Sequence, residues 1–171
     1  MEEISANITI GGRVTRTQWE AMVEAEPLLD NYLPDRRRNR DKNDQNPHIF
    51  GQGPLELYAP QATWGHFEAL EAYLQEQGIP YDRHADGNWE YDAVEASWRP
   101  GMGDELSVFA SSDGDIVVKA SRLIEWIRKG LTLPEVLGAE PNDDTSGIWL
   151  HWLRETDPVP PFEFVEGDES C

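Results

Sequence analysis

Apolar and polar positions divide the chain into short elements, beginning with a strand–turn–helix unit. Residues 7–14 alternate apolar and polar side chains around a glycine pair, which predicts a strand with a turn or bulge. Thr17 and Glu20 have the spacing of a capping box, so a helix is expected from there until Pro27. This first unit ends before a polar stretch at 34–54 that is rich in Pro, Gly and Asn.

A second strand–helix unit follows the polar stretch. Residues 55–59 are typical of a strand, and Thr63 is expected to cap a helix that runs to about Gln77. The apolar residues of this segment recur at helical spacing, Gly78 suits the position after a helix, and Pro80 prevents continuation.

Two hairpins and a third helix are predicted in the next part of the chain. Residues 79–85 and 89–98 flank the turn Asp86-Gly87-Asn88. Residues 105–110 and 115–120 flank a second turn centred on Asp113-Gly114. Ser121 is expected to cap a helix through Lys129, with Gly130 at its end.

The last part of the chain has weaker patterns. Residues 131–137 contain Pro134 and indicate a short helical turn. Residues 148–153 form an apolar run whose periodicity fits a strand and a helix equally. Residues 162–165 are expected to be an edge strand or an extended tail, and the acidic residues 166–171 a frayed end.

These elements predict an α+β fold, with an antiparallel sheet built from hairpins and two or three helices packed on one face. The length fits a single acidic domain over residues 1–165, with a long polar loop at 34–54.

Charge changes the picture more than any motif does. The chain has 33 acidic and 14 basic residues, which gives a formal net charge of −19. Such a charge repels nucleic acid and anionic membranes and attracts basic protein surfaces. An acidic surface that only keeps the protein in solution is an equally good interpretation.

Much of the acid falls on segments that are predicted to be folded, so we expect one acidic face that binds a partner. Its residues are Glu68, Glu71, Glu76, Asp82, Asp86, Glu90, Asp92 and Glu95, with Trp64, Trp89 and Trp98 at its margin. In charge, though in no motif, the composition is similar to that of small acidic inhibitors, including DNA mimics carried by phages and plasmids. The expected function is an inhibitor that blocks the basic groove of a nucleic-acid-handling protein of host defence, without direct contact to nucleic acid or membrane.

One basic island interrupts the acidic chain. Its arginines are Arg36, Arg37, Arg38 and Arg40. Residues 35–44 hold five basic and three acidic residues, a charge of +2, which leaves −21 on the rest. This loop is expected to fold back on the acidic surface, or else to touch phosphate or an acidic partner.

Two other functions stay open. Asp82, His84 and Asp86 would share one face of a strand and could hold a divalent metal or act as an acid/base set, although a polar strand face explains them as well. No catalytic motif and no cofactor motif is present, so no cofactor is expected. The seven Trp residues allow the third function, a structural or accessory subunit of an oligomer.

The cysteine content and the first residues bear on location. The single Cys171 allows no disulfide within the chain. The first residues lack the basic and apolar regions of a signal peptide, and no apolar run is long enough to span a membrane. A cytoplasmic location is therefore expected.

Overall fold

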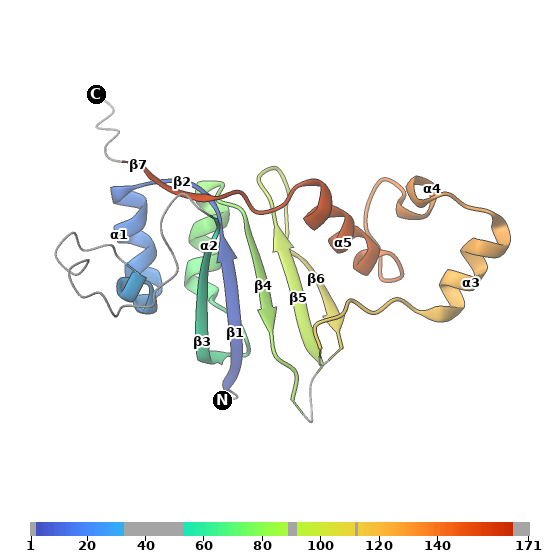
Figure 1. Ribbon diagram of the computed structural model, residues 1–171, viewed down its shortest axis with the longest axis horizontal. Coiled ribbons are helices and arrows are strands. Elements are labelled where there is room, and N and C mark those ends of the chain that lie inside the picture. The colour runs from blue at the N-terminus through green and yellow to red at the C-terminus, as the bar shows by residue number, and fades with distance from the viewer. Residues whose placement is uncertain (1–2, 33–52, 89–91, 112, 166–171) are drawn as a thin grey trace.

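A five-stranded antiparallel sheet forms the centre of the molecule, as a computed structural model shows for residues 3–32, 53–88, 92–111 and 113–165 (Figure 1). The strand order is β3-β1-β4-β5-β6. The strands are β1 (Glu3–Ile10), β3 (Leu55–Thr63), β4 (Tyr81–Ala85), β5 (Ala93–Trp98) and β6 (Leu106–Ala110). The predicted α+β class with an antiparallel sheet is confirmed, and so is the hairpin of β4 and β5.

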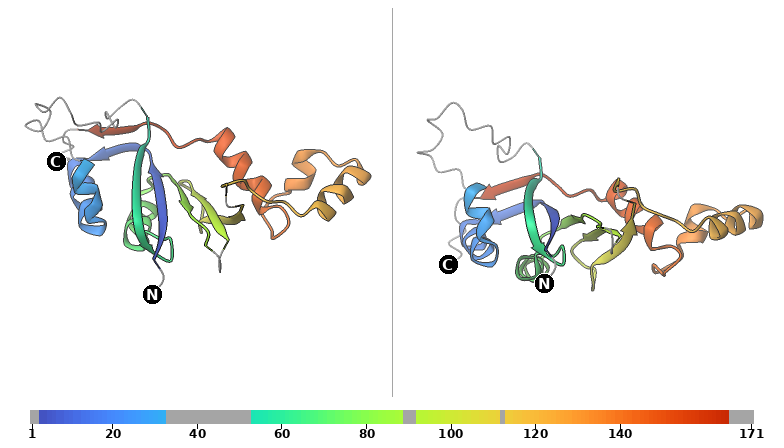
Figure 2. Two further views of the ribbon diagram at one scale, coloured as in Figure 1. Left: turned by 60° about the horizontal axis from the view of Figure 1, so that its bottom comes forward. Right: turned by 90° about the horizontal axis from the view of Figure 1, so that it is seen from below.

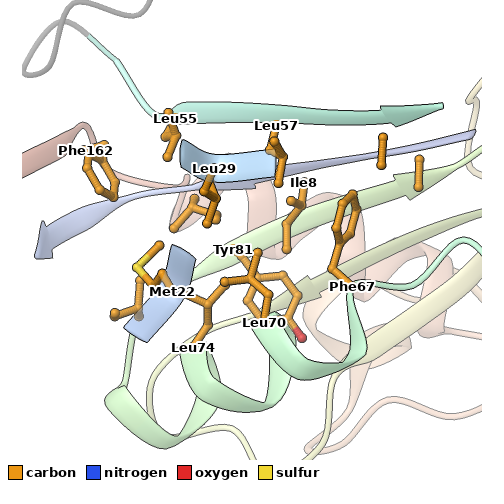
Figure 3. Close-up of a cluster of buried hydrophobic side chains, with 14 of the residues drawn as sticks. Ile8, Met22, Leu29, Leu55, Leu57, Phe67, Leu70, Leu74, Tyr81 and Phe162 are labelled. Atoms are coloured by element: carbon orange, nitrogen blue, oxygen red, sulfur yellow. The ribbon is translucent and has the colours of Figure 1, made fainter. Parts of the chain in front are cut away.

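The core lies between this sheet and the helices α1 (Arg16–Ala25), η1 (Pro27–Tyr32) and α2 (Glu68–Gln77). Alternate residues of the central strands, including Ile8 and Tyr81, point toward α2, whose Leu70 and Leu74 are fully buried against them (Figure 3). Burial of each leucine contributes roughly 1.5–3 kcal/mol to folding. Helical apolar spacing thus predicted the buried side of α2.

The rest of the chain lies on the other side of the sheet and beyond it. Helix α5 (Ser146–Thr156) contacts the face opposite α2, because its Arg154 reaches Glu95 and Ser97 of β5. Helices α3 (Ala120–Lys129) and α4 (Leu133–Leu137) lie past β6, away from the core (Figures 1 and 2).

The glycine pair moves the chain from the large sheet into a small one. β2 (Gly12–Thr15) pairs in parallel with β7 (Phe162–Val165), so the C-terminal segment forms a strand. A Cβ on Gly11 would lie 1.9 Å from the carbonyl oxygen of Pro160, so only glycine allows this approach. Phe162 then packs its ring edge-on against Trp19, which joins the small sheet to the core.

The predicted N-caps of the helices are displaced from the observed ones by two to four residues. Helix α1 is capped by Thr15, whose side chain accepts from the backbone N–H of Gln18 at 3.2 Å, and not by Thr17. Thr63 caps no helix, because it ends β3 and pairs with Glu3 in the sheet. Helix α3 has Lys119 at its N-cap, two residues before the predicted cap Ser121. Long-range strand pairing, which local spacing does not encode, explains the largest of these errors.

Residues 115–120 form no strand, contrary to the predicted second hairpin. Only an isolated bridge joins Ala110 to Ile116. The segment packs instead on α5, where a Cβ on Gly147 would lie 2.7 Å from the Ile116 side chain. The ambiguous run 148–153 belongs to that helix. The helix ends at Gly78 and Gly130 are confirmed, since both glycines take the left-handed conformation.

Several predictions fall outside the described residues. These are the basic island at 36–40, most of the loop at 34–54, Trp89, Glu90 and the end at 166–171. In the part of the chain that the structure describes, no helix has the length and apolar character needed to cross a membrane. A single domain over 1–165 stays a prediction.

Candidate functional site

The acidic residues do not gather on one face, because two of them are buried in ion pairs. Glu71 is 7% exposed, and its Oε1 lies 3.0 Å from the Nε of Arg83, which is 1% exposed. Arg83 also donates to Glu105 at 2.7 Å and to the carbonyl of Gly65 at 3.0 Å. Glu71 therefore holds α2 and the preceding turn on the sheet and is not available to a partner.

Glu95 and Asp82 are used on the opposite face of the sheet. Arg154 donates to Glu95 at 2.7 Å and to the hydroxyl of Ser97 at 2.9 Å. That hydroxyl donates to Asp82 at 2.6 Å, and Arg99 donates to the same carboxylate at 2.9 Å. These bonds attach α5 to β4 and β5, so both carboxylates are structural.

The tryptophans divide in the same way. Trp98 is buried and stacks on Tyr81, so it forms no margin of a binding surface. Trp64 is 52% exposed at the turn after β3. Glu68 and Glu76 are exposed on α2, whereas Asp86 and Asp92 are exposed at the open end of the β4–β5 hairpin. Asp86 and Asp92 line the same pocket as the exposed rings of Trp64 and Phe109.

The proposed metal trio does not come together. His84 lies between two carboxylates, with Nδ1 2.5 Å from Glu95 and Nε2 2.9 Å from Asp86. Asp82 lies instead with Arg99 and Ser97. Across the residues that the structure describes, no group of three His, Cys, Asp or Glu side chains is arranged to hold a metal ion.

A pocket of about 310 Å³ opens at the end of the sheet where Asp86 and Asp92 lie. This volume is at the lower end of the range for small-ligand sites. Its lining is Ile4, Trp64, Ala85, Asp86, Asp92, Val94 and Phe109. The pocket thus combines an apolar floor, two aromatic side chains and the carboxylate of Asp92, with Asp86 at its edge.

Strand register explains how these residues meet. Ala85 of β4 pairs with Val94 of β5, which pairs with Phe109 of β6, so their side chains share one face of the sheet. Ile4 stands on the same face two residues before Ala6, the partner of Ala85. This is the face that α2 covers, but α2 lies over the part around Tyr81 and Arg83 and leaves this end open.

Trp64 is held at the pocket by an unusual backbone. Its φ is +55°, a left-handed conformation that costs a bulky residue on the order of 1–3 kcal/mol. The next residue, Gly65, lies against β4, where a Cβ would be 2.5 Å from the Cβ of Ala85. The buried Arg83 donates a hydrogen bond to the Gly65 carbonyl and fixes this turn on the sheet. The fold therefore keeps an exposed aromatic ring in a strained position, as happens at ligand sites.

Asp92 supplies negative charge to the pocket, whereas the Asp86 carboxylate is bonded to Ser5 and His84, whose side chains lie on the opposite face of the sheet. A hydrogen bond from the Ser5 hydroxyl lowers the pKa of Asp86, and His84 acts in the same direction. Asp86 is therefore a carboxylate at neutral pH. Among the residues that the structure describes, no lysine or arginine lines the pocket. A ligand in this site would meet negative charge beside aromatic surface.

Helix α3 presents a second exposed surface of different character. None of its residues is buried, and Ile127 is 69% exposed. Its apolar stripe continues into neighbouring segments, and the exposed members are Leu123, Ile124, Ile127, Leu131 and Leu133. Arg128 and Lys129 follow at its last turn, so this part is locally basic on an acidic protein.

The sequence patterns predicted part of the pocket and missed the rest. Trp64, Asp86 and Asp92 were expected at a binding surface, but Phe109, Val94 and Ile4 were not. One signal was available for Phe109: residues 106, 108 and 110 are apolar and fill one face of the strand, so a large apolar side chain on the other face, beside Ser107, is not needed by a solvated face. No protein-family model, no curated protein and no solved structure matches this chain.

Proposed function

We propose that this protein is an acidic protein-binding module that docks on a basic surface of a nucleic-acid-handling protein and keeps nucleic acid away from it. The observation that supports this best is the pocket at the open end of the sheet, where Asp86 and Asp92 lie beside the exposed rings of Trp64 and Phe109. The net charge of −19 favours a basic partner and would speed its approach.

The docking surface is smaller than the acidic face expected from the sequence. Glu71 and Glu95 are buried, and Asp82 is held by Arg99, so they add to the protein's field without touching a partner. Specific contacts are left to the pocket end of the sheet. In this proposal the long-range charge steers the partner and the pocket anchors it.

The test is capture of basic proteins on the immobilised chain, followed by a displacement assay. The chain should retain a nucleic-acid-binding protein at low salt and much less at high salt, and should displace nucleic acid from it in a gel-shift assay. The double variant Asp86→Asn/Asp92→Asn should lose displacement. The control Glu24→Gln/Asp30→Asn makes the same charge change on α1 and η1 and should retain it.

Two outcomes would reject the proposal. One is that no basic protein is retained at either salt concentration. The other is that the two double variants lose displacement equally, since general charge and not the pocket would then be responsible. A phage or plasmid origin and a cytoplasmic location stay predictions and are not needed for this test.

The other two functions also stay predictions. A metal-dependent activity at Asp82, His84 and Asp86 would require bound metal in the purified protein and its loss in His84→Ala. A subunit of an oligomer would bury the apolar stripe of α3, and a monomeric mass in light scattering would contradict it.

A further inference from the structure

The pocket has the chemistry of a site for one organic cation. The electron-rich faces of aromatic rings attract cations, and a ring of aromatic side chains with nearby carboxylates is the usual arrangement for this purpose. Here Trp64 follows the edge strand β3 and Phe109 is on the opposite edge strand β6, so the two rings enter the pocket from its two sides. Asp92, two residues before Val94, supplies the charge between them.

The floor of the pocket suits an alkyl chain. Ile4, Ala85 and Val94 come from three adjacent strands and present only apolar groups to the cavity. A side chain with a methylene stem and a cationic head can therefore bury the stem on this floor and keep its charge near the carboxylate of Asp92. A free metal ion or a small inorganic cation would gain nothing from this surface.

We infer that the pocket binds a single arginine side chain of the partner, with its guanidinium between Trp64 and Phe109 and its N–H groups toward Asp92. This inference rests on the proposed function, whose partner it describes at one contact. Guanidinium is favoured over ammonium because it is planar, stacks on aromatic rings and pairs with carboxylates through two parallel hydrogen bonds. It also sheds water more easily than ammonium does.

Three matched probes separate charge from shape. N-acetyl-arginine methylamide, its lysine counterpart and its neutral citrulline counterpart would be titrated into the ¹⁵N-labelled full chain. The arginine probe should shift the Trp64 indole resonance and the amides of Ala85, Val94 and Phe109. The lysine probe should bind more weakly, and the citrulline probe, which has nearly the same shape without charge, should cause no saturable shift.

Variants locate the site. Phe109→Ala and Asp92→Asn should each weaken the arginine probe about fivefold or more, the range that one cation–π contact or one charged partner supplies. Tyr58→Ala removes an equally exposed ring from the other face of the sheet and should leave the affinity unchanged. Amide spectra of each variant would show that it is folded.

The results of the probe titrations and of the displacement assay separate this inference from the proposed function. Equal binding of citrulline, tighter binding of lysine, or absence of a saturable shift with arginine would overturn the inference. If the probes are silent while the chain still displaces nucleic acid from a basic protein, the inference fails and the proposed function stands. If arginine binds as expected but no basic protein is retained, the proposed function fails instead.

Discussion

Gly65 shows how much of the pocket depends on a single residue. It has a φ of +68° and directly follows the strained Trp64 in the chain. Its Cα has room for a hydrogen but not for a methyl group against Ala85. The close approach of Gly65 to Ala85 thus sets the position of Trp64, whose side chain forms one wall of the pocket. Stability and ligand binding should therefore respond together at this position.

We expect Gly65→Ala to lower the free energy of unfolding by roughly 2 kcal/mol or more, from left-handed strain and overpacking against Ala85. It should also move Trp64 and weaken the arginine probe. Gly103→Ala is the control, because nothing lies within 4 Å of its added Cβ, and its effect should stay within about 0.5 kcal/mol. Urea unfolding measures both variants, and equal effects would show that the turn is not close-packed.

Asp86 gives the site a dependence on pH. Its pKa is lowered in the folded state, chiefly by the Ser5 hydroxyl bond, so the unfolded chain binds the proton more readily. The stability from this group is complete above the ordinary Asp pKa, about 3.9, and is lost as pH falls through the lower folded pKa.

Thermal unfolding followed from neutral to acid pH would test this linkage. Ser5→Ala should raise the pKa of Asp86 in an NMR titration and should make the loss of stability at acid pH smaller than in the unmodified protein. Asn31→Ala, whose side chain bonds only within η1, serves as the control. An Asp86 pKa that does not move in Ser5→Ala would contradict the assigned cause.

At the level of elements, α5 is attached to the sheet by a group of polar contacts as well as by its buried Leu150. Arg154 alone donates to Glu95, to Ser97 and to the carbonyl of Ala96. Removing it would leave the buried Glu95 with only His84. A buried charge that loses its partner is costly, whereas loss of an exposed pair matters little.

Arg154→Met should therefore lower the free energy of unfolding by about 3 kcal/mol. His151→Ala, which removes an exposed pair with Glu155 from the same helix, should change it by less than about 1 kcal/mol. Adding Glu95→Gln to Arg154→Met should restore part of the loss, because the unpaired charge is then gone. If the double variant is less stable than Arg154→Met alone, Glu95 contributes to stability mainly through His84.

The same helix shows why sequence patterns predicted some elements and not others. The end of α2 and the β4–β5 hairpin follow from local chemistry, a glycine after a helix and a turn between alternating segments. The run 148–153 belongs to a helix that packs against β5 and β6, a long-range contact that its own periodicity does not indicate. Likewise, nothing near Glu71 in the sequence indicates that Arg83 will bury it. Burial of ionised groups follows from pairing across the fold.

At the scale of the whole molecule, attractive and repulsive electrostatics act over different distances. Arg83, Arg99 and Arg154 are each bonded to carboxylates at 2.7–2.9 Å, and salt screens such short, partly buried pairs little. The remaining surface carries the excess of a −19 chain, whose self-repulsion opposes folding and extends as far as the Debye length. That length falls from about 30 Å at 0.01 M salt to about 8 Å at 0.15 M.

Sodium chloride should therefore stabilise this protein over that range, because it screens the repulsion and leaves the buried pairs. The free energy of unfolding from urea titrations should rise with salt. The rise should be smaller in a variant with Glu24→Gln, Asp30→Asn, Glu68→Gln and Glu76→Gln, which brings the formal charge from −19 to −15. A free energy of unfolding that falls with salt would mean that the ion pairs, and not the excess surface charge, dominate the electrostatics of folding. In that case the acidic surface would not destabilise the free protein, and a basic partner would relieve no repulsion by binding.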